Sequence, residues 1–270
     1  MAASPPLRRM SFWDHIEELR RRLKWSFVTV LILFAFFGFF EARVAFVGGI
    51  AVPYPWPNPI RPFASQFFSA AVLYVKPSYV ELVVLSPSEG FIAQIKTAFF
   101  LAVVVGSPVI SHQFFQFMAP GLYEAERRAI MRLVVPSVLL FLWGVLLAFF
   151  VVVPFALAFL YQVAAGLGAR PFLQVDEFLD FVILFLLGFG GAFQLPVVMY
   201  ALTASGLVRA AMWRKYWRFA ILGIFVFGAV ITPDGSGVTM LLVSLPMTFL
   251  YVAGWAVSVL RERRVNRESS

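Results

Sequence analysis

The segment LVVPSVLLFLWGVLLAFFVVVPFALAFLY, residues 133–161, decides the fold class, because no charged side chain interrupts it. A membrane-spanning helix needs about 20 mostly apolar residues, so the segment predicts a helix that crosses a bilayer. The helical pattern begins further upstream, near Glu124. From there to Tyr161, about 38 residues at ~1.5 Å each exceed a hydrocarbon core of ~30 Å. We therefore expect this helix to tilt and to bend at Pro154.

The composition of the whole chain also indicates a membrane protein. Hydrophobic residues make up 61% of the 270 residues and charged residues 13%, whereas soluble domains are about half apolar and about a quarter charged. A soluble fold of this size could not bury so much apolar surface. Cysteine is absent and only two histidines are present, which excludes a disulfide framework and argues against a metal centre. We expect no metal and no cofactor.

Six membrane-spanning helices are predicted, in an all-α fold that forms a single membrane domain over residues 1–270. Residues 1–24 form a cytoplasmic arm with an amphipathic helix, and residues 261–270 form a cytoplasmic tail. The uncharged part of the fifth span, Phe219 to Ile231, covers only ~20 Å, so the bilayer should thin beside it. The six spans are expected at about 25–40, 89–115, 124–161, 176–203, 213–231 and 238–260.

Lysine and arginine are distributed unequally between the connections. The N-terminal arm, the second-to-third and fourth-to-fifth connections and the C-terminal tail each carry a basic cluster. The opposite connections hold only Arg43, Arg61, Lys76 and Arg170. Basic loops stay in the cytoplasm, so both termini should be cytoplasmic. This rule also accounts for the net charge of +8, and it makes lipid rather than nucleic acid the expected partner of the basic residues.

The longest connection, residues 41–88, lies on the opposite side and is rich in proline. Proline at this density excludes a continuous helix. The aromatic residues Tyr54 and Trp56 lie between the prolines, and they favour a structured extracytoplasmic cap at the membrane interface. A disordered linker is the alternative. The prolines concerned are Pro53, Pro55, Pro57, Pro59 and Pro62.

Two acidic clusters are predicted to face the cytoplasm among many arginines. In the first, Phe12–Leu23, apolar residues recur at helical spacing, and Glu18 lies four residues before Arg22. Such a pair is also ordinary on a solvated helix face. In the second cluster, Phe117–Arg128, Glu126 falls in the first turn of a helix, where the helix dipole alone would favour an acid. Together, two carboxylates at one interface could bind the guanidinium groups of a ligand with adjacent arginines.

Five motifs, in order along the chain, resemble the TatC family, the multi-span core subunit of the twin-arginine protein translocase. The resemblance covers nearly the whole chain, from His15 to about Leu260. It is carried by His15-Ile16-Glu17-Glu18-Leu19-Arg20-x-Arg22-Leu23, by Ser107-Pro108-Val109-Ile110, by Phe117-Met118-Ala119-Pro120-Gly121-Leu122-Tyr123-x-x-Glu126-Arg127-Arg128, by Phe193-Gln194-Leu195-Pro196-Val197 and by Ile231-Thr232-Pro233-Asp234.

The resemblance implies a function in protein export across a bacterial or archaeal cytoplasmic membrane. It implies binding of the twin-arginine signal peptides of folded precursors, recruitment of single-span TatA- or TatB-type subunits, self-association in a receptor complex, and transport driven by the proton gradient. Glu18 and Glu126 would contact the two arginines of the signal peptide. Around them, the resemblance assigns supporting roles to Arg20, Phe117, Pro120, Leu122 and Tyr123.

A second set of polar residues is expected to dock the partner subunits. Gln194 stands at a position where many relatives carry Glu, and we interpret it as a hydrogen-bond partner for an incoming helix. Bonding within the bundle is the alternative, since polar groups in a membrane usually face the protein interior. Thr232 and Asp234 occupy a turn that matters for assembly in the family, although ordinary turn chemistry also explains the acid. The glycines near Gln194, Gly191 among them, should let helices approach closely.

Two other classes of function are alternatives to this one. A secondary transporter for a small solute is favoured by the polar residues Lys96 and Gln194 within predicted spans, but no internal repeat supports it. A membrane-bound enzyme would need a nucleophile and a base in a recognisable arrangement, and none is present. We therefore do not expect an enzyme.

Overall fold

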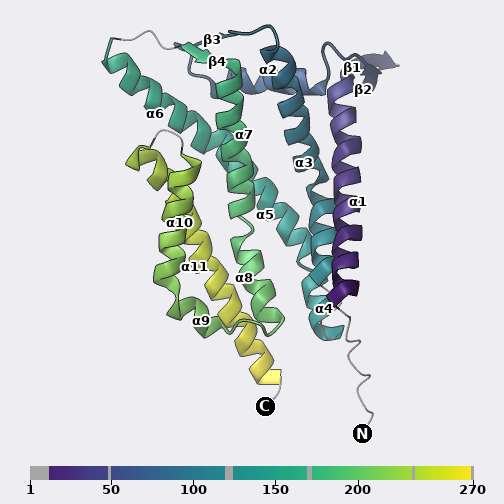
Figure 1. The fold of residues 1–270 in the computed structure, drawn as a ribbon, viewed down its shortest axis with the longest axis vertical. Helices are drawn as coiled ribbons and strands as arrows, with labels where there is room; N and C mark the ends of the chain where they lie inside the picture. The colour runs from purple at the N-terminus through teal and green to yellow at the C-terminus, as the bar shows by residue number, and fades with distance from the viewer. Residues whose placement is uncertain (1–11, 48–49, 119–123, 169–171, 233–234, 269–270) are drawn as a thin grey trace. The chain divides into compact units, whose positions relative to one another are not determined.

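The computed structural model describes residues 12–47, 50–118, 124–168, 172–232 and 235–268. The fold is mainly helical (Figure 1). The helices are α1 (Phe12–Phe39), α2 (Phe63–Val75), α3 (Glu89–Met118), α4 (Glu124–Met131), α5 (Val134–Leu147), the π-helical turn η2 (Ala148–Val152), α6 (Val153–Gly166), α7 (Val175–Ala192), α8 (Leu195–Ala204), α9 (Ala210–Lys215), α10 (Trp217–Ile231) and α11 (Gly237–Glu268).

Two small sheets complete the fold, and the prediction of an all-α chain missed them. Strands β1 (Phe40–Val47) and β2 (Ile50–Pro57) form an antiparallel hairpin, and β3 (Glu81–Val83) pairs in parallel with β4 (Phe172–Gln174). The Pro-rich connection after α1 therefore contains a hairpin, the helix α2 and a short strand. Whether it caps the bundle stays a prediction.

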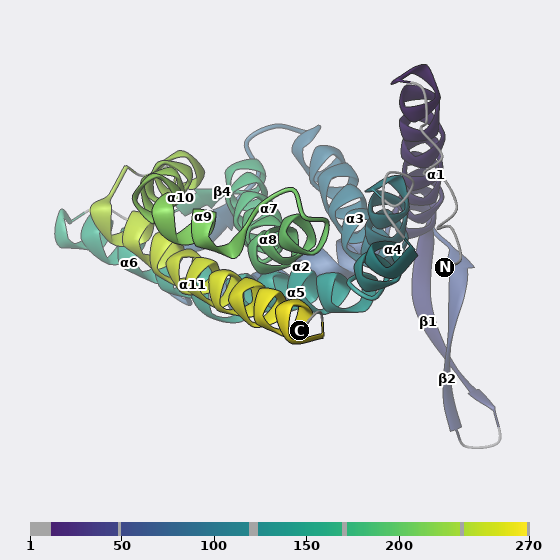
Figure 2. The same ribbon diagram turned by 90° about the horizontal axis from the view of Figure 1, so that it is seen from below.

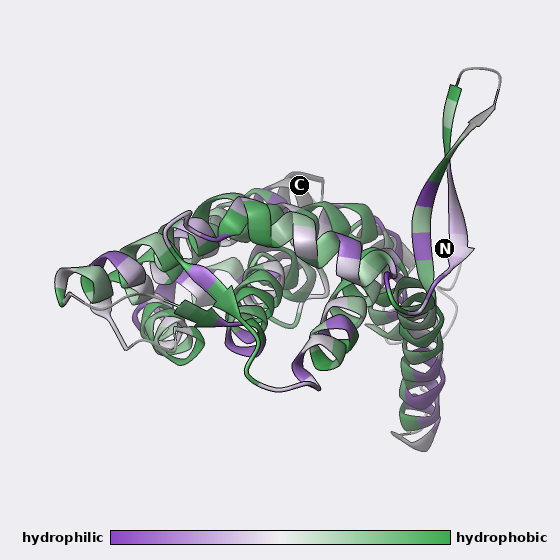
Figure 3. Cartoon of the chain, turned by 90° about the horizontal axis from the view of Figure 1, so that it is seen from above, coloured by the Kyte–Doolittle hydropathy of each residue, from purple (hydrophilic) through white to green (hydrophobic). Residues whose placement is uncertain are grey.

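Five helices of the described part are long and apolar enough to cross a membrane. They are Trp13–Phe39, Glu89–Met118, Val134–Gly166, Val175–Ala204 and Gly237–Arg263. They coincide with five of the six predicted spans, and hydrophobic residues cover most of their length (Figure 3). The predicted fifth span is the apolar helix α10, which is shorter at 15 residues. Six spans with both termini in the cytoplasm stay a prediction.

Helix α1 joins two segments that were predicted as separate. The amphipathic arm and the first span form one continuous helix of 28 residues. Nothing in the sequence from Phe12 to Phe39 interrupts it, since this stretch contains no proline and its only glycine is Gly38, near the C-terminal end. Helix α11 also continues beyond the predicted span, into the predicted cytoplasmic tail as far as Glu268, although it contains Pro246.

Proline residues explain the interruptions of the other long helices. Proline lacks an N–H and its ring clashes with the carbonyl four residues earlier. The wide turn η2 lies directly before α6 and its Pro154, close to the predicted bend. The predicted third helix has a second break, at Arg132 and Leu133, upstream of Pro136. In the same way, two residues separate the end of α7 from α8, whose first turn contains Pro196.

The chain forms two compact units by its internal contacts. Unit 1 consists of Met1–Phe27, Ser107–Gly144 and Gly190–Ser270, and unit 2 consists of Val28–Gly106 and Val145–Phe189. In unit 2, rings from α7 form a buried core, and Phe67 of α2 lies 6.1 Å from the ring of Phe100 and 6.3 Å from that of Phe149. The fully buried rings of α7 are Phe178, Phe185 and Phe189.

In unit 1, α8 and α11 run side by side (Figures 1 and 2). A Cβ built on Gly254 of α11 would lie 2.8 Å from Sδ of Met199 and 2.9 Å from Cα of Pro196 on α8. Gly228 of α10 faces Ser244 of α11 in the same way. Close helix approach thus occurs at these two glycines. At Gly191, where it was predicted, a Cβ would meet no atom within 4 Å.

Candidate functional site

The N-terminal turns of α1 and the C-terminal turns of α3, both in unit 1, form the candidate site. Glu18 is buried, with 7% of its surface exposed, while the neighbouring apolar residues of the same helix are exposed. Those exposed residues include Trp13, Ile16 and Leu19. A carboxylate is rarely buried without a charged partner, so the surroundings of Glu18 decide what the site can do.

Arg22 is the partner that holds Glu18. Its guanidinium lies 3.2 Å from Oε1 of Glu18, one helical turn away. The same guanidinium donates to Oε1 of Gln113 at 3.2 Å and to the side-chain oxygen of Gln116, both on α3. Gln116 in turn lies 2.9 Å from Nε2 of His112. Arg22 therefore ties α1 to α3 and fixes the position of the carboxylate.

The second oxygen of Glu18 has no such partner. Oε2 is buried, and it accepts no hydrogen bond within the part of the chain that the structure describes. An ionised carboxylate offers about four lone-pair positions on its two oxygens. A buried acceptor that lacks a donor costs about 1–3 kcal/mol. Glu18 therefore keeps the capacity to accept from a further donor, which the described residues do not supply.

Two other predicted residues belong to the same two helices as this site. The ring of Phe117, at the end of α3, stacks on the ring of His15 with 4.4 Å between centroids and 20° between planes. This contact joins the same two helices that Arg22 joins. Arg20 is exposed on α1.

Five predicted residues fall where the structure gives no side chain. Glu126 belongs to the first turn of α4, as predicted, but its side chain lies outside the description. Pro120, Leu122, Tyr123 and Asp234 lie outside the described residues altogether. Their predicted roles stay predictions.

Gln194 lies at the break between α7 and α8 and bonds within unit 1. The Ser137 hydroxyl donates to its Oε1 at 2.6 Å, and its Nε2 donates to the carbonyl of Ser137 at 3.0 Å. The amide therefore follows the intra-bundle alternative in this structure. Thr232 is similarly satisfied, because its buried hydroxyl donates to the carbonyl of Gly228 at 2.9 Å.

Lys96, in unit 2, is fully paired. Its ammonium lies 2.6 Å from Oδ1 of Asp176 and 2.7 Å from Oδ1 of Asp180, both on α7. Nearby, Glu89 accepts from the backbone N–H groups of Leu85 and Ser86 and from the side chain of Gln174. These contacts join the N-terminal parts of α3 and α7, and they leave Lys96 with a structural role.

Comparison with known proteins places the chain in a family. The profile of the family described as Sec-independent protein translocase protein (TatC) matches residues 14–246. The chain belongs to the TatC family. The matched range includes Glu18, Arg22 and the residues of α3 that bond Arg22. Over 255 residues it is 42% identical to a Sec-independent protein translocase protein TatC of Cenarchaeum symbiosum, which covers 94% of this chain and 97% of the relative.

Further TatC proteins are similar to the chain in sequence and in structure. A TatC protein of Aquifex aeolicus is 35% identical over 249 residues, with 90% of this chain and 92% of the relative covered. A crystal structure described as the twin arginine translocase receptor TatC superposes with a TM-score of 0.71 at 33% identity, and it covers 91% of this chain and 98% of the other. The chain is thus a membrane component of the Sec-independent protein translocase, with a transport role rather than that of a classical enzyme.

Sequence reasoning missed several residues of the TatC site. Gln113 and Gln116 bond Arg22, and Ser137 bonds Gln194. The sequence did contain one signal on α3, because the polar residues His112 and Gln116 are four positions apart and therefore share a helix face. No local pattern connects Ser137 with Gln194, which lies 57 positions away.

Proposed function

We propose that this chain is the receptor subunit of the translocase and that Glu18 binds an arginine of the twin-arginine signal peptide. The buried Oε2 of Glu18, which lacks a donor within the described residues, carries the proposal. A guanidinium supplies the missing donor and a compensating charge together. The relative solved as a twin arginine translocase receptor supports the same role.

The geometry of the site favours arginine over lysine. A guanidinium presents paired donors in a plane that matches a carboxylate, whereas an ammonium is a compact point charge. Arg22 already occupies Oε1 of Glu18, so an incoming guanidinium would bind Oε2, and the groups that bury this oxygen would have to move aside. Glu126, in the first turn of α4, would take the second arginine. The proposal rests on the backbone position of Glu126 and on the resemblance of its motif.

Binding of a signal peptide to the full chain in lipid nanodiscs tests the proposal. Glu18→Gln should weaken binding of an Arg-Arg peptide about 10- to 150-fold, because a hydrogen bond to a charged group contributes about 1.5–3 kcal/mol. Glu17→Gln is the matched control, since Glu17 is the adjacent glutamate and is exposed. It should bind as the wild type does.

A Lys-Lys peptide completes the experiment. It should bind the wild type weakly and should lose little more with Glu18→Gln. Equal losses for Glu17→Gln and Glu18→Gln would show that only the overall charge matters. Unchanged binding of the Arg-Arg peptide by Glu18→Gln would remove Glu18 from the receptor site.

We further propose that six spans, with both termini in the cytoplasm, present Gln194 to single-span partner subunits, and that the proton gradient drives the transport. An incoming helix would exchange one of the two bonds between Gln194 and Ser137 for its own. Photo-crosslinking from position 194 tests this: crosslinks to a single-span subunit support it, and crosslinks confined to this chain contradict it.

A further inference from the structure

The hairpin of β1 and β2 follows directly after α1, and its strand β2 is exposed. Figures 1 and 2 show that the hairpin projects sideways from the C-terminal end of α1 and does not continue along the axis of that end. All eight residues of β2 are exposed, including Ile50 at 70% and Val52 at 43%. On β1, Val44 is 58% exposed. Such a ribbon is marginal in water by itself, so something must cover it.

The sequence of the tip contains no polar side chain. Residues 44–53 read VAFVGGIAVP, with valine, alanine, phenylalanine, glycine, isoleucine and proline only. The charges of the hairpin, Glu41 and Arg43, lie at its base, and Figure 3 shows hydrophilic colour there and hydrophobic colour at the beginning of β2, near the tip. The hairpin is therefore amphipathic along its length, with a polar base and an apolar tip.

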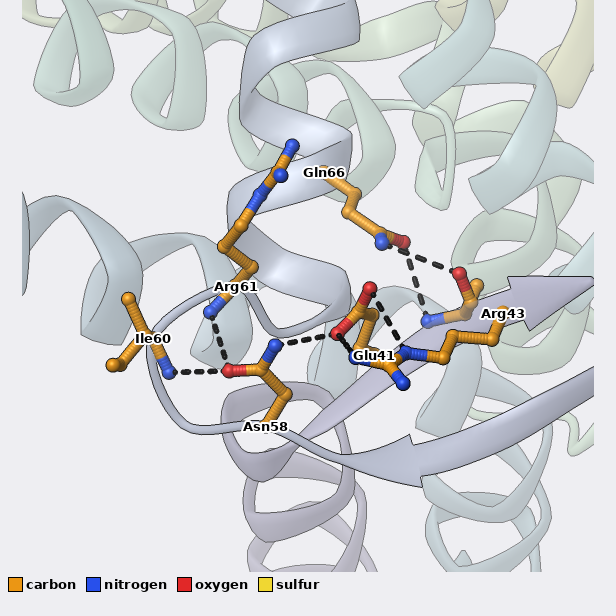
Figure 4. Close-up of polar contacts among 7 residues, drawn as sticks. Glu41, Arg43, Asn58, Ile60, Arg61 and Gln66 are labelled. Carbon is orange, nitrogen blue, oxygen red and sulfur yellow. Dashed lines mark hydrogen bonds and ion pairs between the residues drawn. The ribbon is translucent and has the colours of Figure 1, made fainter.

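A polar network fixes the base (Figure 4). The Asn58 amide donates to Oε2 of Glu41 at 2.5 Å, and Arg43 lies 3.4 Å from Oε1 of the same carboxylate. The guanidinium of Arg43 also lies 5.5 Å from the ring centre of Trp56. Tryptophan, tyrosine and arginine are the residues that settle at the level of lipid headgroups.

The outer edge of β2 is adapted to surroundings poor in water. Pro53, Pro55 and Pro57 pair with Val44, Ala42 and Phe40. Gln66 bonds both backbone groups of Ala42, so the backbone groups of these pairs point away from the partner strand. Prolines at such positions remove N–H groups that would otherwise lack acceptors, and they also block pairing with another strand.

We propose that the tip of this hairpin, of which the structure describes residues 44–47 and 50–53, inserts into the lipid surface at the end of α1. The span Trp13–Phe39 ends one residue before β1 begins, so the base of the hairpin lies at the membrane boundary. Eight residues at about 3.3 Å each give a reach of ~26 Å along that boundary. The tip enters the headgroup region and the upper acyl chains only, because an open strand edge is not tolerated deeper.

The absence of cysteine allows a direct test on the full chain in lipid vesicles. A single cysteine replaces Val52, and a second protein carries one at Glu81, an exposed charged position on β3. Both are labelled with an environment-sensitive fluorophore. The label at position 52 should emit further to the blue, and lipids with a spin label high on the acyl chain should quench it more strongly than the label at 81. Iodide in the water should quench the label at 81 more strongly.

A variant of the tip tests whether lipid contact causes the quenching of the label at position 52. Ile50→Asp places a charge on an exposed side chain and should abolish the lipid quenching at position 52 without loss of folded protein. Equal iodide quenching at positions 52 and 81 would overturn the proposal, because the tip would then lie in water. Protection of position 52 from both quenchers would overturn it too and would indicate a protein partner or a second copy of the chain. Stronger quenching from deep spin labels would contradict the shallow insertion.

Discussion

Gly254 is predicted to be indispensable for the contact between α8 and α11. A methyl group at this position would lie 2.9 Å from Cα of Pro196, whereas carbon atoms pack at about 3.5–4.0 Å. The side chain of Met199 can rotate away, but Pro196 is backbone, so α8 must shift by at least about 0.6 Å. Gly254→Ala should therefore destabilise the protein although alanine is the better helix former.

The magnitude follows from two opposing contributions. Overpacking of a tight contact costs about 1–3 kcal/mol, and replacing a glycine in a helix interior by alanine returns up to about 1 kcal/mol. We expect a net loss of about 1–2 kcal/mol for Gly254→Ala. Gly223 in α10 is the matched control, because a Cβ there would meet no atom within 4 Å. Gly223→Ala should leave stability unchanged or raise it by up to about 1 kcal/mol.

Unfolding of the full chain in mixed micelles, titrated with a denaturing detergent and followed by tryptophan fluorescence, measures both variants. The midpoint for Gly254→Ala should fall below that of the wild type, and the midpoint for Gly223→Ala should not. If both substitutions gave the same midpoint, the close contact between Gly254 and Pro196 would be refuted. Because Gln194 lies two residues before Pro196, Gly254→Ala should also reduce photo-crosslinking from position 194.

Three further predictions concern a hydrogen bond, a short helix and a titrating carboxylate. Ser137→Ala should cost about 0.5–1.5 kcal/mol by the same micelle titration, because Gln194 loses one of two hydrogen bonds; no loss would show that the bond contributes nothing. The helix Trp217–Ile231 should thin the bilayer, since its 15 residues span only ~22 Å. Spin labels at its two ends should therefore both lie at shallow depth. A bilayer of ordinary thickness beside the helix would contradict this prediction. The Asn58 amide, followed by Arg43, holds the pKa of Glu41 below its ordinary value of 4.5. This stabilisation is present above that ordinary value and is lost as the pH falls through the lower folded value. Asn58→Ala should raise the NMR titration midpoint of Glu41, and an unchanged midpoint would contradict the assigned cause.

Features governed by local rules were predictable from the sequence. Apolar length predicted five of the long helices, since a bilayer accepts only segments of a given length. The wide turn η2 directly before Pro154 agrees with the missing N–H of proline, while the predicted bend stays a prediction. The ion pair of Glu18 with Arg22 followed from helical spacing. Each of these needs only residues that are close together in the chain.

The hairpin was missed because its prolines were interpreted only as evidence against a helix. Their spacing held a second signal. Pro53, Pro55 and Pro57 recur every second residue, and the backbone groups of a strand alternate in direction with the same period. Prolines at this spacing can all occupy an outer edge, where no N–H is needed. The Gly-Gly pair at residues 48–49, between two apolar runs, was a further hairpin signal in the sequence.

The bonds between distant helices could not be predicted, and they bear directly on function. The solute-transporter alternative depended on Lys96 and Gln194 as free polar groups within the membrane. The structure bonds Lys96 to two carboxylates and Gln194 to Ser137. Glu18 differs from both, because one buried oxygen of its carboxylate keeps an unfilled acceptor within the described residues. A transporter needs its unsatisfied groups near the bilayer midplane, whereas a receptor for a peptide needs them where the peptide arrives. The unfilled acceptor of Glu18 lies in the second turn of α1, before the apolar part of that helix begins, and this position agrees with the proposed receptor role.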